Sequence, residues 1–126
     1  MSPFNVVAVI AITLSVTSGL AHSQAYPSRP IRYVVPSASG GSPDIGARLE
    51  AAELTRQLGQ QVVVDNRTGA NGIIGMEAIA HAVPDGYTFG MGNVATLAIN
   101  PHLYLKLPYD PVKDYAAVSL TAEINN

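Results

Sequence analysis

Residues 31–48 constrain the fold of this chain more than any other stretch, because their pattern is that of a strand, a glycine-containing loop and the start of a helix. An apolar, β-branched and aromatic run predicts a strand over residues 31–35. Pro36 should end that strand, since proline cannot donate a hydrogen bond to the ladder. Small residues fill the loop over 37–42 and leave its backbone N–H groups uncovered. The stretch therefore predicts the first strand–helix unit of an α/β fold.

The end of this loop has the sequence of a helix N-terminus. Ser42 is expected as the N-cap, Pro43 at the first helical position and Asp44 in the first turn. A helix N-terminus behind Gly40 and Gly41 presents N–H donors and the positive end of the helix dipole, which can bind an anion. By themselves these residues are more typical of a tight connection without a ligand, and the rest of the chain shifts the interpretation toward a binding site.

Strand and helix patterns alternate beyond this unit. We predict a helix over residues 44–58, a strand over 61–65 that is buried by composition, a helix over 73–83, a third strand over 87–91 and a fourth over 116–122. Parallel strands joined by right-handed helical crossovers accommodate this order. The expected fold class is α/β, a parallel sheet with flanking helices.

Two helices carry further signals. The helix over 44–58 has apolar residues at helical spacing on one face, namely Ala47, Ala51, Leu54 and Leu58. A weaker stripe on the opposite side, formed by Ile45, Leu49 and Ala52, has no assigned neighbour. Residues 100–101, an Asn-Pro pair, repeat the cap-then-proline signature and predict the start of a short helical turn.

Three loops should leave the carboxyl ends of the first three strands, over residues 37–42, 68–72 and 93–96. Open α/β sheets bind their ligands at this edge. All three loops are small, polar and nearly free of side-chain charge, so their donors are backbone N–H groups and Ser, Thr or Asn side chains. Such a lining can hold a carboxylate by hydrogen bonds and helix dipoles without an ion pair.

Several function classes find no support in the sequence. A net charge of −2, from 7 basic and 9 acidic residues, does not indicate a nucleic-acid partner. No nucleophile elbow, phosphate-binding loop or dinucleotide fingerprint is present. The histidines are scattered and none has metal-ligand spacing with carboxylates, so we expect no metal and no cofactor. The sequence favours a binding protein, and the alternative left open is a small α/β enzyme acting on a carboxylated or phosphorylated substrate.

The first 25 residues differ in kind from the remainder, since no charged side chain precedes Arg29. Residues 6–16 are apolar except for two hydroxyl residues, a length that suits a signal peptide and is too short to span a membrane. We predict a signal peptide over residues 1–23, with cleavage after Ser23 or alternatively after Ala25; a buried N-terminal strand or helix is the competing interpretation. Because the chain has no cysteine, it has no N-terminal lipid anchor on cysteine, and we expect a soluble periplasmic protein.

Several motifs along the chain match one family of proteins. The stretch Tyr-Pro-Ser-Arg-Pro-Ile-Arg over residues 26–32 resembles the mature start of the Bug family, the extracytoplasmic solute receptors of tripartite tricarboxylate transporters. The first loop resembles the family pattern Pro-Phe-x-x-Gly-Gly-x-x-Asp-x-x-Ala-Arg, with Ser37 where Phe is usual. In the second loop, Thr68 stands where Pro is common and Asn71 where Gly is common, and Asn tolerates the left-handed backbone of such a turn. Further matching stretches are residues 58–72, 84–88, 100–104 and 107–115.

The resemblance implies a fold like that of type II periplasmic binding proteins, in which a ligand is gripped between two lobes. Residues 24–126 correspond to the N-terminal part of the first lobe, and the second lobe is absent, so we expect a fragment or a truncated gene product. The implied function is capture of a small organic acid and its delivery to the membrane permease subunits of the transporter. A nonfunctional truncated remnant is the remaining alternative.

The resemblance also implies which residues of this lobe contact the carboxylate. They are small or polar residues of the three loops: Ser37, Ala38, Ser39, Gly40, Gly41, Ser42, Gly69, Ala70, Asn71, Gly72, Asn93, Ala95 and Thr96. Asp44 is expected to fix the first loop rather than touch the ligand. No catalytic residue is expected.

Overall fold

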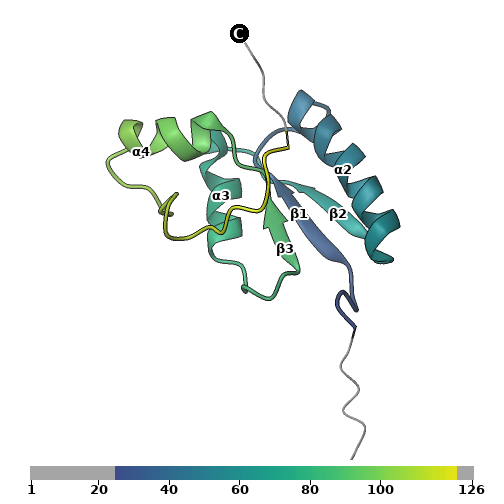
Figure 1. The fold of residues 1–126 in the computed structure, drawn as a ribbon. Helices are drawn as coiled ribbons and strands as arrows, with labels where there is room; N and C mark the ends of the chain where they lie inside the picture. The colour runs from purple at the N-terminus through teal and green to yellow at the C-terminus, as the bar shows by residue number, and fades with distance from the viewer. Residues whose placement is uncertain (1–24, 122–126) are drawn as a thin grey trace, which may run out of the picture.

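The computed structural model describes residues 25–121, and the centre of the fold is a three-stranded parallel sheet (Figure 1). The strands are β1 (Ile31–Val35), β2 (Val62–Asn66) and β3 (Thr88–Gly90), in the order β2-β1-β3. Ile31 lies opposite Val62 and Arg32 lies opposite Thr88. The α/β class and the parallel sheet predicted from the alternating pattern are therefore confirmed.

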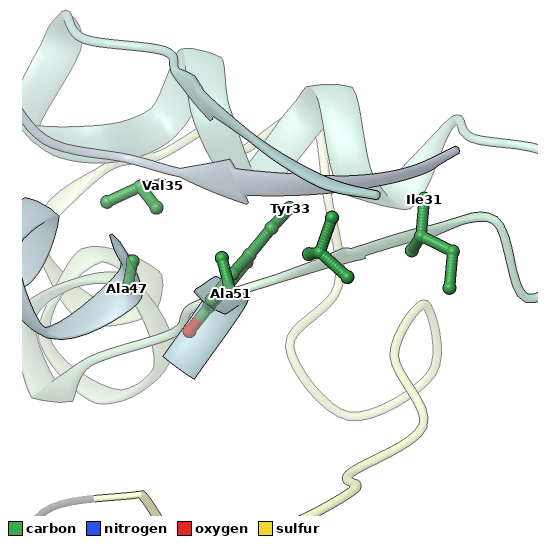
Figure 2. Packing of buried hydrophobic residues seen from close by; sticks show 6 residues of the cluster. Ile31, Tyr33, Val35, Ala47 and Ala51 are labelled. Atoms are coloured by element: carbon green, nitrogen blue, oxygen red, sulfur yellow. The ribbon is translucent and has the colours of Figure 1, made fainter. Parts of the chain in front are cut away.

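Two helices cover opposite faces of this sheet, α2 (Ser42–Leu58) and α3 (Ile73–Ala80) (Figure 1). On the α2 face, the side chains of Ile31, Tyr33 and Val35 lie on the same side of β1 as Ala47 and Ala51, as Figure 2 shows. These residues alternate along the strand because successive side chains point to opposite faces of a sheet. Burial of this apolar cluster, with Val62, forms the core beneath α2.

The α3 face is packed through glycines. A Cβ built on Gly90 would lie 2.1 Å from Ile79 Cδ1, and one built on Gly75 would lie 2.8 Å from the Cα of Pro36. Helix α3 therefore approaches the backbone of the strands and of the first loop more closely than any larger residue allows. Met76, 2% exposed, fills the space between α3 and its neighbours.

The start of α2 differs from the prediction by one residue. Gly41 is the N-cap and Ser42 is the first helical residue, with no side-chain cap bond. The reason is that the first helical hydrogen bond runs from the Ile45 N–H to the Gly41 carbonyl at 3.0 Å. The predicted end is confirmed, because Gly59 has a φ of 67° and donates its N–H to Thr55 O.

The expected loop at residues 93–96 is instead the beginning of a helix. Val94 is already helical, the π-helix η3 (Ala95–Ile99) follows, and it runs directly into α4 (Asn100–Leu103). Asn100 consequently continues a helix and does not start one. The short 3₁₀ turn η2 (Ala70–Gly72) lies in the second loop.

Three further predictions need correction. Residues 116–121 form no strand and pair with no strand within residues 25–121; Val118 is 91% and Leu120 78% exposed there. A strand needs a ladder partner, and apolar alternation alone does not provide one. Strand β2 lies at the edge of the sheet and is only partly buried, since Val63 is 45% exposed. Helix α3 ends at Ala80 rather than at residue 83.

The stripe of Ile45, Leu49 and Ala52 on α2 is exposed to solvent in the described part of the chain. The predicted signal peptide and its cleavage after Ser23 lie outside the described residues, as does the end of the predicted fourth strand. Within residues 25–121, no helix is both long enough and apolar enough to cross a membrane.

Candidate ligand-binding site

The three loops that follow the strands converge at Gly72. A Cβ built on Gly72 would lie 2.7 Å from Cγ2 of Thr96, which lies in η3 at the end of the predicted third loop, and 3.4 Å from the carbonyl oxygen of Pro36, which directly precedes the first loop. Gly72 has a φ of 84°, which also excludes larger residues. Because the strands are parallel, all three loops lie at the carboxyl edge of the sheet, as the sequence predicts.

Asp44 ties the first loop to α2. Its side chain is almost fully buried, and its Oδ2 accepts hydrogen bonds from the Gly40 N–H at 2.8 Å, from Arg48 Nε at 3.0 Å and from Ser39 Oγ at 3.4 Å. The Arg48 guanidinium, followed by the Gly40 N–H, lowers the pKa of Asp44 to about 2. These bonds stabilise the carboxylate form and hold the loop against the first turn of the helix.

These hydrogen bonds determine which polar groups of the first loop are used within the protein and which remain unpaired. The Gly40 N–H is already used by Asp44, so Gly40 can serve a ligand by close approach rather than by donation. Its φ is 85° and no heavy atom lies within 4 Å of the place where its Cβ would stand. Buried atoms without a hydrogen-bond partner among the described residues are Ser37 Oγ and Asp44 Oδ1. Both atoms lie beneath the surface of the loop, so neither is accessible to a ligand in this arrangement.

Arg48 joins the first loop to the carboxyl end of β2, and sequence reasoning missed it. Its Nη2 lies 3.5 Å from Ser39 Oγ and 3.4 Å from Asn66 Oδ1, and Asn66 in turn donates from Nδ2 to Ser37 O at 3.2 Å. The expectation of loops nearly free of charge holds for the loops themselves, but α2 brings this guanidinium beside them. The available signal was its spacing of four residues from Asp44 on one helix face.

The second loop has an unusual backbone. Four consecutive residues have positive φ, from Gly69 at 117° through Ala70 at 45° and Asn71 at 54° to Gly72 at 84°. The expectation that Asn71 tolerates a left-handed backbone is confirmed. Its Nδ2 donates to Asn100 Oδ1 at 2.8 Å, and Asn100 Nδ2 donates to Asn71 O at 3.1 Å.

The third loop is closed by its own side chains. The Thr96 N–H donates to Asn93 Oδ1 at 2.9 Å, and the Asn93 N–H donates to Thr96 Oγ1 at 3.0 Å. Thr96 is 1% exposed, and its carbonyl accepts a hydrogen bond from Tyr109 Oη at 2.6 Å. The Ala95 N–H lies in the first helical turn, where N–H groups lack intrahelical acceptors. The loop thus presents a helix N-terminus, with Thr96 fixing it from the inside.

Other places in the described residues have weaker evidence for a ligand or metal site. An open surface hollow beside α4, lined among others by Tyr104, Tyr109, Asp110 and Asp114, contains no residue of the three loops. Its carboxylates are engaged locally, since Asp110 accepts from the Val112 and Lys113 N–H groups. Within residues 25–121, no group of three or more His, Asp or Glu side chains could hold a metal ion.

A parallel α/β unit with polar loops gathered at its carboxyl edge defines the class of α/β ligand-binding lobes. The chain belongs to the tripartite tricarboxylate transporter receptor family, whose model matches residues 46–125. That family is described as one of receptors. Protein BugT of Bordetella pertussis is 40% identical over 128 residues, which cover 98% of this chain and 39% of BugT. A UPF0065 protein of Bordetella bronchiseptica is 45% identical over 112 residues, 89% of this chain and 33% of that protein.

Solved structures show the same fold. The chain is similar to a periplasmic transporter with 51% identity and a TM-score of 0.69, covering 71% of this chain and 30% of that one. The periplasmic binding protein BugD is 40% identical with a TM-score of 0.67, and the match covers 71% of this chain and 29% of BugD. MatC from Rhodopseudomonas palustris with bound malate is 42% identical with a TM-score of 0.67, and the match covers 71% of this chain and 30% of MatC. An R. palustris protein with adipate is 43% identical with a TM-score of 0.66, and the match covers 68% of this chain and 29% of that protein. The chain therefore spans about a third of the length of its relatives.

Proposed function

We propose that this chain is the first-lobe part of an exported receptor that captures a small organic acid. The observation that carries the proposal is the convergence of three polar loops on Gly72 in a chain of this receptor family. Two of its structural relatives are described with bound malate and bound adipate, both small dicarboxylates. The whole receptor would deliver its acid to the membrane permease subunits of a tripartite tricarboxylate-type transporter, in a periplasmic location.

We propose different roles for the loop residues. Gly40 and Gly72 permit close approach of the ligand and of the neighbouring loops, respectively. Direct donors are backbone N–H groups at the two helix starts. The Ser37 hydroxyl is buried and would have to rotate outward to donate to the ligand. Asp44 fixes the first loop, and Thr96 fixes the third, by hydrogen bonds within the protein. The remaining proposed contacts are Ala38, Ser39, Gly41, Ser42, Gly69, Ala70, Asn71, Asn93 and Ala95.

Neutral donors suit a carboxylate here because Arg48, the cation beside the first loop, is already engaged. Arg48 pairs with Asp44 across the first turn of α2, so the pair as a whole carries no net charge toward the ligand. Helix N-termini and oriented N–H groups then provide the positive potential. The enzyme alternative has no support from the family, and no metal or cofactor is needed for this binding mode.

A two-lobed hybrid tests the proposal. Residues 25–121 would be joined to the part of MatC that the chain does not match, and binding of malate, adipate, citrate, succinate and glutamate would be measured by calorimetry. We expect at least one acid to bind and its neutral amide analogue to fail, because the donors recognise the carboxylate. Binding of none of the acids, by a hybrid that unfolds cooperatively, would contradict the proposal and favour a nonfunctional remnant.

A further inference from the structure

The position of Asn100 in the sequence does not explain why its side-chain amide is buried. As a continuation of η3 it does not cap a helix, and it is 0% exposed. Both halves of the amide are engaged by a single residue, Asn71, which lies in the second loop. A buried amide with its hydrogen bonds made is specific for one partner arrangement, because leaving either group unpaired is costly.

The π-helical turn places Asn100 where it can reach the second loop. Pro101 has no N–H, so it can donate neither to Leu97 O, as an α-helix requires, nor to Thr96 O, as a π-helix requires. The Asn100 N–H instead donates to Ala95 O, five residues back, which releases the carbonyl of Thr96. Tyr109 Oη takes up that carbonyl at 2.6 Å. The wide turn is thus stabilised from a segment outside it.

The partner of Asn100 is the strained part of the second loop. Asn71 at φ 54° and Ala70 at φ 45° both adopt a left-handed backbone that L residues with a Cβ disfavour. The bond from Asn100 Nδ2 to Asn71 O fixes the backbone, and the bond from Asn71 Nδ2 to Asn100 Oδ1 fixes the side chain. The turn that this sets also makes the bond from the Gly72 N–H to Gly69 O at 3.0 Å.

From this geometry we infer that Asn100 is a positioning residue that aims the Gly69–Gly72 turn at the ligand carboxylate. Tyr109 supports it by holding the π-helical turn open. Neither residue touches the ligand. The inference rests on the proposed function for its ligand, but the effect of Asn100 on the turn does not depend on any ligand.

Two readouts separate positioning from a loss of stability. The first is hydrogen exchange, by mass spectrometry, over residues 68–75 of the whole chain. The second is malate affinity in the hybrid. The variant is Asn100→Ala, and the matched control is Thr55→Val, which removes the bonds from Thr55 Oγ1 to Ala51 O and from the Val62 N–H at the opposite end of α2.

We expect Asn100→Ala to accelerate exchange in the turn and to weaken malate binding about tenfold, while Thr55→Val changes neither beyond its effect on overall stability. Glycine adopts φ 54° without side-chain contacts, so Asn100→Ala should cost only about twofold in an Asn71→Gly background. Unchanged exchange and affinity in Asn100→Ala, relative to Thr55→Val, would overturn the inference. If the unmodified hybrid binds no acid, the proposed function fails, and exchange in the turn alone then decides whether Asn100 positions it.

Discussion

Asp44 is a charged side chain with almost no exposed surface, and its environment explains why burial is tolerated. A buried carboxylate is stable only when paired and hydrogen-bonded, and Asp44 has the Gly40 N–H and Arg48 Nε on one oxygen. The first loop is therefore held by an interaction that depends on the charge of one residue. This dependence makes the loop sensitive to acid.

The pH dependence of stability follows from the direction in which the pKa of Asp44 is shifted. The pKa of Asp44 is lowered from 3.8 to about 2, so its contribution is present above about pH 4 and is lost as the pH falls toward 2. Asp44→Asn should remove that part of the dependence. Urea unfolding of both proteins between pH 2 and pH 7 measures it. Parallel stability curves for the two proteins across this range would show that Asp44 is not the group responsible.

Gly41 tests the first loop as a binding element. Its Cβ would lie 3.4 Å from Ala38 O, an ordinary contact, and its φ of −77° is accessible to valine. We expect Gly41→Val in the hybrid to abolish carboxylate binding while the fold persists, because the side chain blocks approach to the helix N-terminus. Calorimetry with the same acids, and circular dichroism for the fold, are the measurements. Unchanged affinity would remove this loop from the site.

At the scale of elements, the two helices pack on the sheet in different ways. Helix α2 uses the apolar side chains of Ala47 and Ala51, whereas α3 uses the absence of a side chain at Gly75. Gly75 brings α3 against Pro36 and the carbonyl of Arg67, which are parts of the first and second loops. The position of two loops thus depends on one helix–loop contact.

Two glycine substitutions distinguish these packing modes. Gly75→Ala should destabilise the fold by about 1–3 kcal/mol, because its Cβ would lie 2.8 Å from Pro36 Cα and 2.9 Å from Arg67 O. Gly46→Ala, in α2, should stabilise it by about 0.5–1 kcal/mol, because no heavy atom outside its chain neighbours and the surrounding helix backbone lies within 4 Å of the added Cβ. Thermal and urea unfolding compare them. Equal effects of both substitutions would argue against the close approach of α3.

At the scale of the whole molecule, the described residues leave much apolar surface uncovered. Leu105, Val112, Val118 and Leu120 are each more than three-quarters exposed, at 106%, 84%, 91% and 78%. Strands β2 and β3 each have one hydrogen-bonded neighbour, β1, within residues 25–121. Unpaired strand edges and exposed apolar groups favour association with other chains.

We therefore expect the chain alone to be marginally stable, prone to aggregate and unresponsive to carboxylates. Three loops on one lobe cover one side of a ligand, whereas small-molecule sites bury most of the ligand surface. Thermal unfolding with and without millimolar citrate, succinate and glutamate, followed together with light scattering, tests this. A monomeric, cooperative transition that one acid shifts upward would show instead that the chain is a complete binding module.

The sequence by itself determined the elements whose signals are local. The strand before Pro36, the end of α2 at Gly59 and the left-handed Asn71 depend on the residue's own backbone preferences, and each is present where predicted. The alternation of strands and helices also determines the parallel order, and parallel strands place the three loops at one edge of the sheet.

The tertiary structure decided what depends on partners distant in sequence. A strand over residues 116–121 requires a neighbour to pair with, and the described residues provide none. The link from Arg48 to Asn66 spans 18 residues, and the exchange between Asn71 and Asn100 spans 29. Hydrogen bonds over such separations leave no periodic trace in the sequence, because they depend on how elements pack rather than on any one element's preference.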